Sequence, residues 1–163
     1  MYYQLKQYFA HLATENKALQ AHTGYFAREI AQRSASYAGI PSPFLSIYDY
    51  SVGLEGEELS SLGQRQICFA VLFSDTPADD LEAQQQAIDQ AEQIALQLLA
   101  RIRWDSHQKR HFLYASFQKE LTRIAPIEEP QAQLYGVEVE LHLKTPCPLS
   151  VNPDHWHDRF LSC

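Results

Sequence analysis

The chain has 163 residues, a length that favours one domain with a core of its own. Its hydrophobic fraction of 45% and charged fraction of 20% are those of a folded protein and argue against disorder. The net charge of −7 argues against a broad basic surface for nucleic acid, and no stretch approaches the ~18 apolar residues of a membrane span. We therefore expect neither nucleic acid nor a membrane among its partners.

The three cysteines, Cys68, Cys147 and Cys163, lie far apart and fit neither a disulfide framework nor the spacing of zinc ligands. A reducing compartment is the simpler inference. The first residues also lack the apolar segment of a signal peptide. These features predict a cytoplasmic protein, or one assembled there into a larger particle.

The N-terminal part predicts two helices. Residues 2–19 place Leu5, Tyr8 and Leu12 at helical spacing, with polar residues on the other side. A second helix is expected over residues 26–37, ended by a glycine. Two prolines in the segment 39–43 then make a stiff turn that leads into a strand.

Two strands follow. Residues 44–54 are rich in aromatic and β-branched side chains, and their alternation places Tyr48 and Tyr50 on one face. A polar loop over 55–63 separates this strand from the run 65–74, which has the uninterrupted apolar character of a strand buried on both faces.

A long helix is predicted over residues 79–104. Acidic residues at its start complement the helix dipole, and the glycine-free, acidic turn that leads into it would repel phosphate. The expected core stripe consists of Leu81, Ile88, Ala91, Ala95, Leu98 and Ile102, widened by Ile94 and Leu99. The expected solvent face consists of Gln84, Gln85, Asp89, Gln90, Glu92, Gln93 and Gln97. A basic cluster at 101–110 is interpreted as the helix end and a solvated loop.

The C-terminal part predicts two more strands and a tail. Residues 117–125 alternate and are expected to form a strand that ends at Pro126, with a short helix as the alternative. Residues 134–144 alternate more clearly, with one apolar and one wet face. From about residue 145 three prolines favour an extended tail.

These elements predict one α+β domain over residues 1–163. Its N-terminal helix is followed by the order β-β-α-β-β, and a mostly antiparallel sheet packs on the long helix.

No motif in the chain indicates catalysis. No nucleophile elbow or phosphate-binding loop is present, so we expect no enzyme, no catalytic residues and no cofactor. The segment 154–158 contains His155 and His157, whose side chains are common metal ligands. Their spacing suits only an extended segment, which favours a docking tail over a metal site and leaves metal binding open.

The layout resembles that of a known family, the tail-terminator (tail-completion) proteins of phages and of phage-tail-like contractile injection particles. The segments that carry the resemblance are PSPFLSIYDYSVGLE (41–55), RQICFAVLFSD (65–75), DDLEAQQQAIDQAEQIALQLLARI (79–102) and LYGVEVELHLKTPCPLSVNPDHW (134–156).

This resemblance implies a non-enzymatic structural protein that assembles into a closed ring, typically of six subunits, and caps a tail tube and sheath. The tube and sheath proteins are then its partners, and the assembled protein is a component of a virion or tail-like particle. The expected contact anchors are Tyr48, Tyr50, Trp156 and Phe160, with core packing as the alternative for the first two. A small protein-binding adaptor and a metal-dependent protein that uses the C-terminal histidines are the rival hypotheses.

Overall fold

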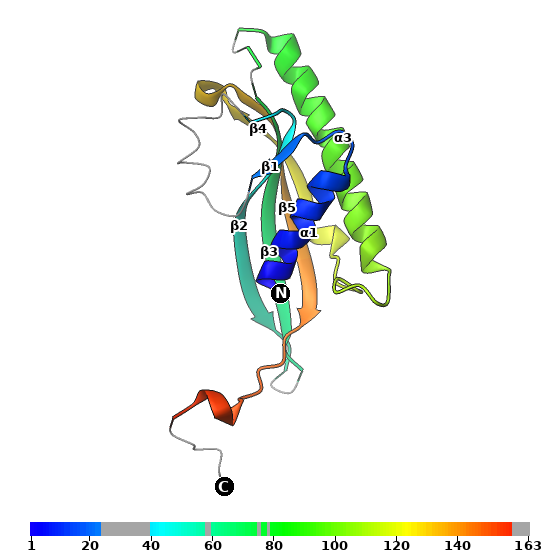
Figure 1. Ribbon diagram of the computed structural model, residues 1–163, viewed down its shortest axis with the longest axis vertical. Helices are drawn as coiled ribbons and strands as arrows, with labels where there is room; N and C mark the ends of the chain where they lie inside the picture. The colour runs from blue at the N-terminus through cyan, green and yellow to red at the C-terminus, as the bar shows by residue number, and fades with distance from the viewer. Residues whose placement is uncertain (24–39, 58–59, 75, 78, 158–163) are drawn as a thin grey trace.

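A computed structural model describes residues 1–23, 40–57, 60–74, 76–77 and 79–157 (Figure 1). The fold is α+β, with an N-terminal helix, a long helix and a five-stranded sheet, as predicted. The predicted second helix at 26–37 and the predicted anchor Phe160 lie outside the described residues.

The sheet has the strand order β1-β2-β3-β5-β4. Its strands are β1 (Ala21–Thr23), β2 (Phe44–Glu55), β3 (Leu62–Phe73), β4 (Arg123–Glu129) and β5 (Leu134–Pro146). Every neighbouring pair is antiparallel except β1–β2, so the prediction of a mostly antiparallel sheet is confirmed. Strand β1 was not predicted, because three residues are too few for a periodic signal.

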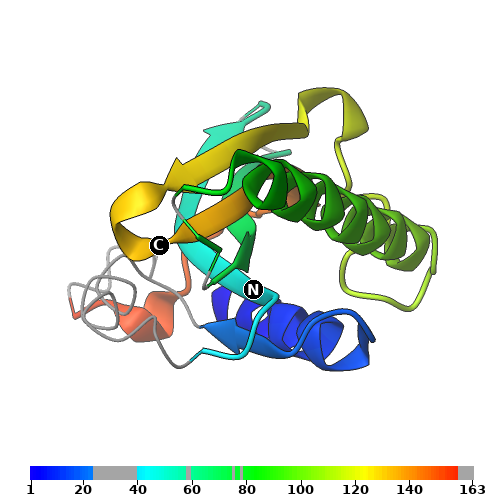
Figure 2. The same ribbon diagram turned by 90° about the horizontal axis from the view of Figure 1, so that it is seen from above.

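Helices α1 (Tyr2–Glu15) and α3 (Leu81–Ser106) lie on the same face of the sheet (Figures 1 and 2). Between them and the sheet lies the main core, which includes Leu5, Phe9, Leu12, Leu45, Ile47, Ile67, Phe69, Val71, Ala91, Ala95, Leu98, Ile102, Leu113, Val137, Val139, Leu141 and Leu143. Residues Ile67 to Leu72 of β3 are buried without a break, which confirms a central strand covered on both faces.

Helix α3 begins directly after a capping residue, Asp80. The carboxylate of Asp80 accepts a 3.0 Å hydrogen bond from the backbone N–H of Ala83 and so caps the helix start.

Two predictions for side chains at the start of α3 are wrong. Leu81 is 71% exposed because it belongs to the first turn, and Gln84 is buried because its amide donates a 2.9 Å hydrogen bond to the carbonyl of Pro77.

Two predicted boundaries are also wrong. The first helix ends at Glu15 and not at residue 19, since the side chain of Asn16 accepts a hydrogen bond from the N–H of Ala18 in the turn that follows. The predicted strand 117–125 is a short 3₁₀ helix, η2 (Lys119–Leu121), followed by β4. Proline at position 126 does not end β4, because an edge strand can leave one side of its backbone without a partner.

Strand β2 contains an irregularity that changes which face its side chains take. The register with β3 shifts between Ile47 and Asp49, as in a β-bulge. As a result, Tyr48 packs with a second cluster around Phe44, whereas Tyr50 packs against the main core. The prediction that the two tyrosines share a face is therefore wrong.

Candidate functional site

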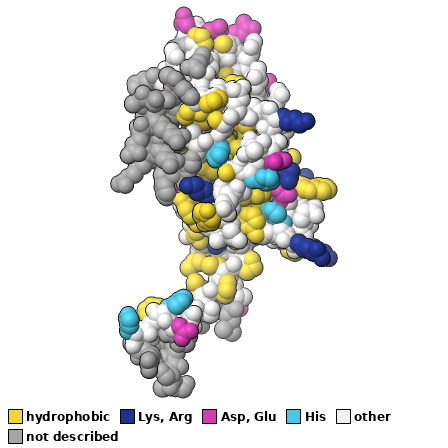
Figure 3. Space-filling model, in the orientation of Figure 1, with side chains coloured by type: hydrophobic (Ala, Val, Ile, Leu, Met, Phe, Trp, Pro, Cys, Tyr) yellow, Lys and Arg dark blue, Asp and Glu magenta, His cyan; other side chains and the backbone are white. Residues whose placement is uncertain are grey.

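The sheet continues beyond the helices at the end that carries the β2–β3 turn, residues 56–61. We call this the distal end; it comprises residues 51–55 of β2, the start of β3 and the last residues of β5. Val52 and Leu54 lie there with 43% and 56% of their surface exposed. Figure 3 shows hydrophobic side chains gathered at this end, between the helices and the tail. Single exposed apolar side chains are ordinary, but a contiguous apolar patch is typical of a contact surface.

The backbone edge of β2 is open at the distal end. Strand β1 pairs only with residues 44–46 of β2. No other strand among the described residues pairs with that edge, and Ser51 to Glu55 are all exposed. The distal half of β2 therefore offers unpaired backbone donors and acceptors to another chain.

The tail begins where β5 ends. The N–H of Cys147 donates a 3.0 Å hydrogen bond to the carbonyl of Ser61, and the chain then runs away from the domain (Figure 1). Leu149, Val151 and Trp156 are 63%, 49% and 55% exposed. The tail thus presents apolar side chains outside the subunit core.

The predicted contact anchors occupy different environments. Tyr48 is half-buried in the second cluster, where burial and then the neighbouring carboxylate of Glu138 raise its pKa well above the usual range of a tyrosine. The ring of Tyr50 packs edge-to-face on that of Tyr2, with 5.1 Å between centroids. Both tyrosines therefore have packing roles inside the subunit. Their contact with another chain, and that of Trp156, stays a prediction.

Arg65 is a buried cation at the distal end. Only 7% of its surface is exposed, and its guanidinium donates to the hydroxyl of Thr145 and the carbonyl of Gly63. Within the described ranges no carboxylate forms an ion pair with it, and its Nε has no hydrogen-bond partner. A buried guanidinium of this kind is suited to a carboxylate from a partner.

Away from the cluster around Phe44, the sheet face opposite the helices is polar, as the alternation in β5 predicted. Glu140 accepts hydrogen bonds from the amide of Gln66 at 2.9 Å and from Nε2 of His142 at 2.8 Å. Cys68 lies beside this network. Burial, and then the carboxylates of Asp49, Glu138 and Glu140, raise the pKa of Cys68 to about 11. The thiol is therefore protonated at neutral pH and a poor nucleophile.

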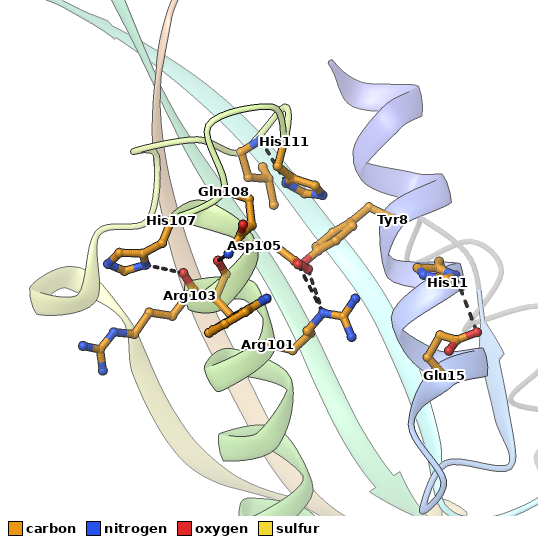
Figure 4. Close-up of polar contacts among 11 residues, drawn as sticks. Tyr8, His11, Glu15, Arg101, Arg103, Asp105, His107, Gln108 and His111 are labelled. Atoms are coloured by element: carbon orange, nitrogen blue, oxygen red, sulfur yellow. Dashed lines mark hydrogen bonds and ion pairs between the residues drawn. The ribbon is translucent and has the colours of Figure 1, made fainter.

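A second polar cluster joins the two helices (Figure 4). The Tyr8 hydroxyl donates a 2.7 Å hydrogen bond to Asp105, and Nε of Arg101 donates to both oxygens of the same carboxylate at 3.2 and 3.0 Å. The ring of His111 packs on that of Tyr8, with 5.4 Å between the ring centroids. Its Nδ1 accepts a hydrogen bond from the N–H of Leu113. The cluster resembles a structural tie more than a catalytic arrangement, because its carboxylate accepts three hydrogen bonds from side chains of the two helices that it joins.

Two open grooves flank the helices. One, of about 440 Å³, lies between the C-terminal end of α1 and the middle of α3. The other, of about 420 Å³, lies between the end of α3 and residues 114–120. Each mixes acidic, basic and apolar side chains, so neither points to one class of ligand.

The histidine-rich segment begins in a local turn, in which the side chain of Asn152 accepts a hydrogen bond from the N–H of Asp154 and its backbone carbonyl accepts one from the N–H of His155, both at 3.1 Å. Asp154 and His155 belong to a single 3₁₀ turn, η4 (Pro153–His155), and both are exposed. Across the described ranges, no three His, Cys, Asp or Glu side chains come together as a metal site would require. Asp158 and Cys163, the other potential ligands nearby, lie outside those ranges.

Comparisons with known proteins leave the family open. No protein-family model matches the chain, and a search of curated proteins found no match.

Among the described helices, none combines the length and the apolar character needed to cross a membrane. Of the exposed residues at the distal end and in the tail, sequence reasoning missed Val52, Leu54, Leu149 and Val151, whose alternating apolar pattern was the available signal.

Proposed function

We propose that this protein is a non-enzymatic structural subunit that assembles into a ring and caps the tube and sheath of a phage tail or phage-tail-like injection particle, as a tail terminator does. The observation that carries the proposal is the distal end, where Val52 and Leu54 are exposed beyond the helices and an apolar tail leaves the subunit. A ring built from one kind of subunit needs two different, complementary surfaces on each copy. The distal end and the tail provide two such surfaces.

Further support comes from the α+β arrangement and the order of its elements, which resemble those expected of a tail terminator. Arg65 is buried and forms no ion pair among the described residues, so it adds a site that a neighbouring carboxylate would complete. Under this proposal the ring is assembled in the cytoplasm and becomes part of the particle. Its partners are further copies of the chain and the tube and sheath proteins.

Light scattering coupled to size-exclusion chromatography tests ring formation. Six copies of an 18.7 kDa chain give a particle of about 112 kDa, and electron microscopy of that fraction should show closed rings. A chain that stays monomeric at every concentration would overturn the ring. A ring that fails to bind purified tube or sheath ends would overturn only its assignment to a tail.

The rival hypotheses predict other results. An adaptor module would stay monomeric and bind its partner one to one. A metal-dependent protein would retain metal through purification and lose it in a variant that combines His155→Ala with His157→Ala. Element analysis of the two preparations separates this case from the others.

A further inference from the structure

The two outer edges of the sheet differ in how they are protected. Edge strand β4 carries Pro126 and three charged residues, Arg123, Glu128 and Glu129, all devices that prevent another strand from pairing with an edge. The exposed edge of β2, residues 51–55, has no proline, and its one charged residue, Glu55, is the last of the strand and forms an ion pair with Lys144. This edge therefore has the composition of a strand that acquires a partner.

The tail has the length and backbone chemistry of such a partner. Residues 148–152 span about 16 Å when extended, the length of the five exposed residues 51–55. Pro148 and Pro153 have no N–H to donate. Successive residues of a strand direct their backbone groups to opposite edges, so alternate residues between the two prolines can still donate to one edge. Leu149 and Val151 share one edge, and neither N–H forms a hydrogen bond within the part of the chain that the structure describes. Two ladder donors are thus available together.

The side chains of the two segments also match. Val52 and Leu54 stand two residues apart on one face of β2, and Leu149 and Val151 stand two residues apart in the tail. Pairing the segments brings the four exposed apolar side chains together as cross-strand neighbours, which stabilises a sheet. The exposed apolar surface of each segment is then covered by the other.

We propose that the tail of one copy, residues 148–152, adds as a strand to the edge of β2 in the next copy. The inference rests on the proposed ring and names the contact that joins its subunits. The neighbouring copy is the favoured acceptor, because β5 is separated from the β2 edge of its own sheet by β3 and the tail points away from the domain (Figure 1). Each subunit then gives one strand and receives one, a head-to-tail contact that forms a ring when the rotation between successive copies closes.

Disulfide trapping tests which residues meet. In a background with Cys147→Ser and Cys163→Ser, a variant that combines Val52→Cys with Val151→Cys should form a ladder of covalent oligomers under mild oxidation. The matched control combines Ala125→Cys, on the exposed edge of β4, with Val151→Cys and should give at least tenfold less product. A product confined to the monomer would show that the tail folds onto its own subunit and would overturn the proposal.

Proline substitutions test the backbone ladder. Val151→Pro removes a donor from the pairing edge, whereas Ser150→Pro removes one from the opposite edge. We expect Val151→Pro to weaken association about tenfold and Ser150→Pro to change it less than about twofold. Thermal unfolding of the subunit should be the same for both, because the tail lies outside the core. Equal effects on association would contradict strand addition.

Failure of this contact is distinguishable from failure of the ring. A wild-type chain that never associates overturns both proposals. A ring that survives deletion of residues 148–163, or in which the Val52 and Val151 cysteines do not crosslink, overturns the strand exchange and leaves the ring intact.

Discussion

The hydroxyl of Tyr8 donates a 2.7 Å hydrogen bond to Oδ2 of Asp105, 97 residues later in the chain, and so ties α1 to the C-terminal end of α3. Both residues are buried, and the Asp105 carboxylate also accepts from Arg101. Burial, and then the hydrogen bond to Asp105, raise the pKa of Tyr8, which keeps its hydroxyl a donor throughout the physiological range.

Replacing Tyr8 by phenylalanine tests this tie. Tyr8→Phe removes the donor and leaves a buried carboxylate oxygen less satisfied, so we expect the free energy of unfolding to fall by about 1–3 kcal/mol. Urea denaturation followed by circular dichroism measures the change. Tyr3→Phe is the matched control, because Tyr3 is 66% exposed and should shift the midpoint little. Equal midpoints for the two variants would argue against the tie.

Gly136 of β5 lies against the backbone of the paired strand β3, where there is no room for a side chain. A Cβ at this position would run into the carbonyl oxygen of Val71, and neither strand can move without disturbing the main core. We expect Gly136→Ala to destabilise the protein by about 1–3 kcal/mol, in the range of overpacked core positions. Gly53→Ala serves as the control, since its Cβ would meet nothing closer than the carbonyl oxygen of Gln64 at 3.9 Å. Thermal unfolding of the two variants should therefore differ clearly.

Strands with strong patterns could be predicted from the sequence. The apolar run of β3 and the alternation of β5 reflect burial on two faces and on one, which is a local property of each strand. Boundaries depended on context that no local pattern contains. Pro126 was interpreted as a strand end, yet it lies inside β4 because β4 is an edge strand, a fact of topology.

The bulge in β2 is another feature that the local sequence pattern does not predict, and it changes the environment of Tyr48, a candidate contact residue. Uninterrupted alternation placed Tyr48 with Tyr50, but the register shift at Ile47 and Asp49 moves Tyr48 to the opposite face. A bulge is set by pairing with β3, and a single strand carries little trace of it.

The exposure of the distal end was equally hard to predict, because it depends on the length of α1 relative to that of β2. Helix α1 has 14 residues and spans about 21 Å, whereas β2 has 12 residues and spans about 40 Å. Val52 and Leu54 are exposed because α1 does not reach them. The sequence contains their alternating pattern but not the relative position of helix and strand.

Titration of Cys68 predicts how stability depends on pH. Its pKa is raised from 9.0 to about 11 in the folded protein, so below about pH 8 the thiol is protonated in both states and contributes no pH dependence. Between pH 9 and 11 the unfolded chain loses the proton more readily, and stability falls as pH rises. We expect wild type to lose about 1–2 kcal/mol more than Cys68→Ala between pH 8 and 10.5. Urea midpoints at the two pH values measure the difference, and parallel losses would contradict it.

The same burial predicts selective alkylation. At pH 8 iodoacetamide should modify Cys147, which is partly exposed, and spare Cys68, which is buried and protonated. Peptide mass spectrometry measures both sites in one sample, and the urea-unfolded chain provides the control in which both react. Fast modification of Cys68 in the folded protein would show that the polar sheet face opens.

Among the predicted anchors that lie in the described ranges, Trp156 is exposed, and its fluorescence can report on assembly. The chain has two tryptophans, so Trp104→Phe leaves Trp156 as the only one, and excitation at a wavelength that tyrosine does not absorb isolates its emission. If the tail docks on a neighbour, Trp156 becomes buried and its emission should move to shorter wavelength as concentration rises through the association range. Trp156→Phe is the reciprocal control, in which Trp104, 64% exposed on α3, should keep one emission maximum. Emission from Trp156 that is independent of concentration, in samples that light scattering shows to be associated, would remove Trp156 from the interface.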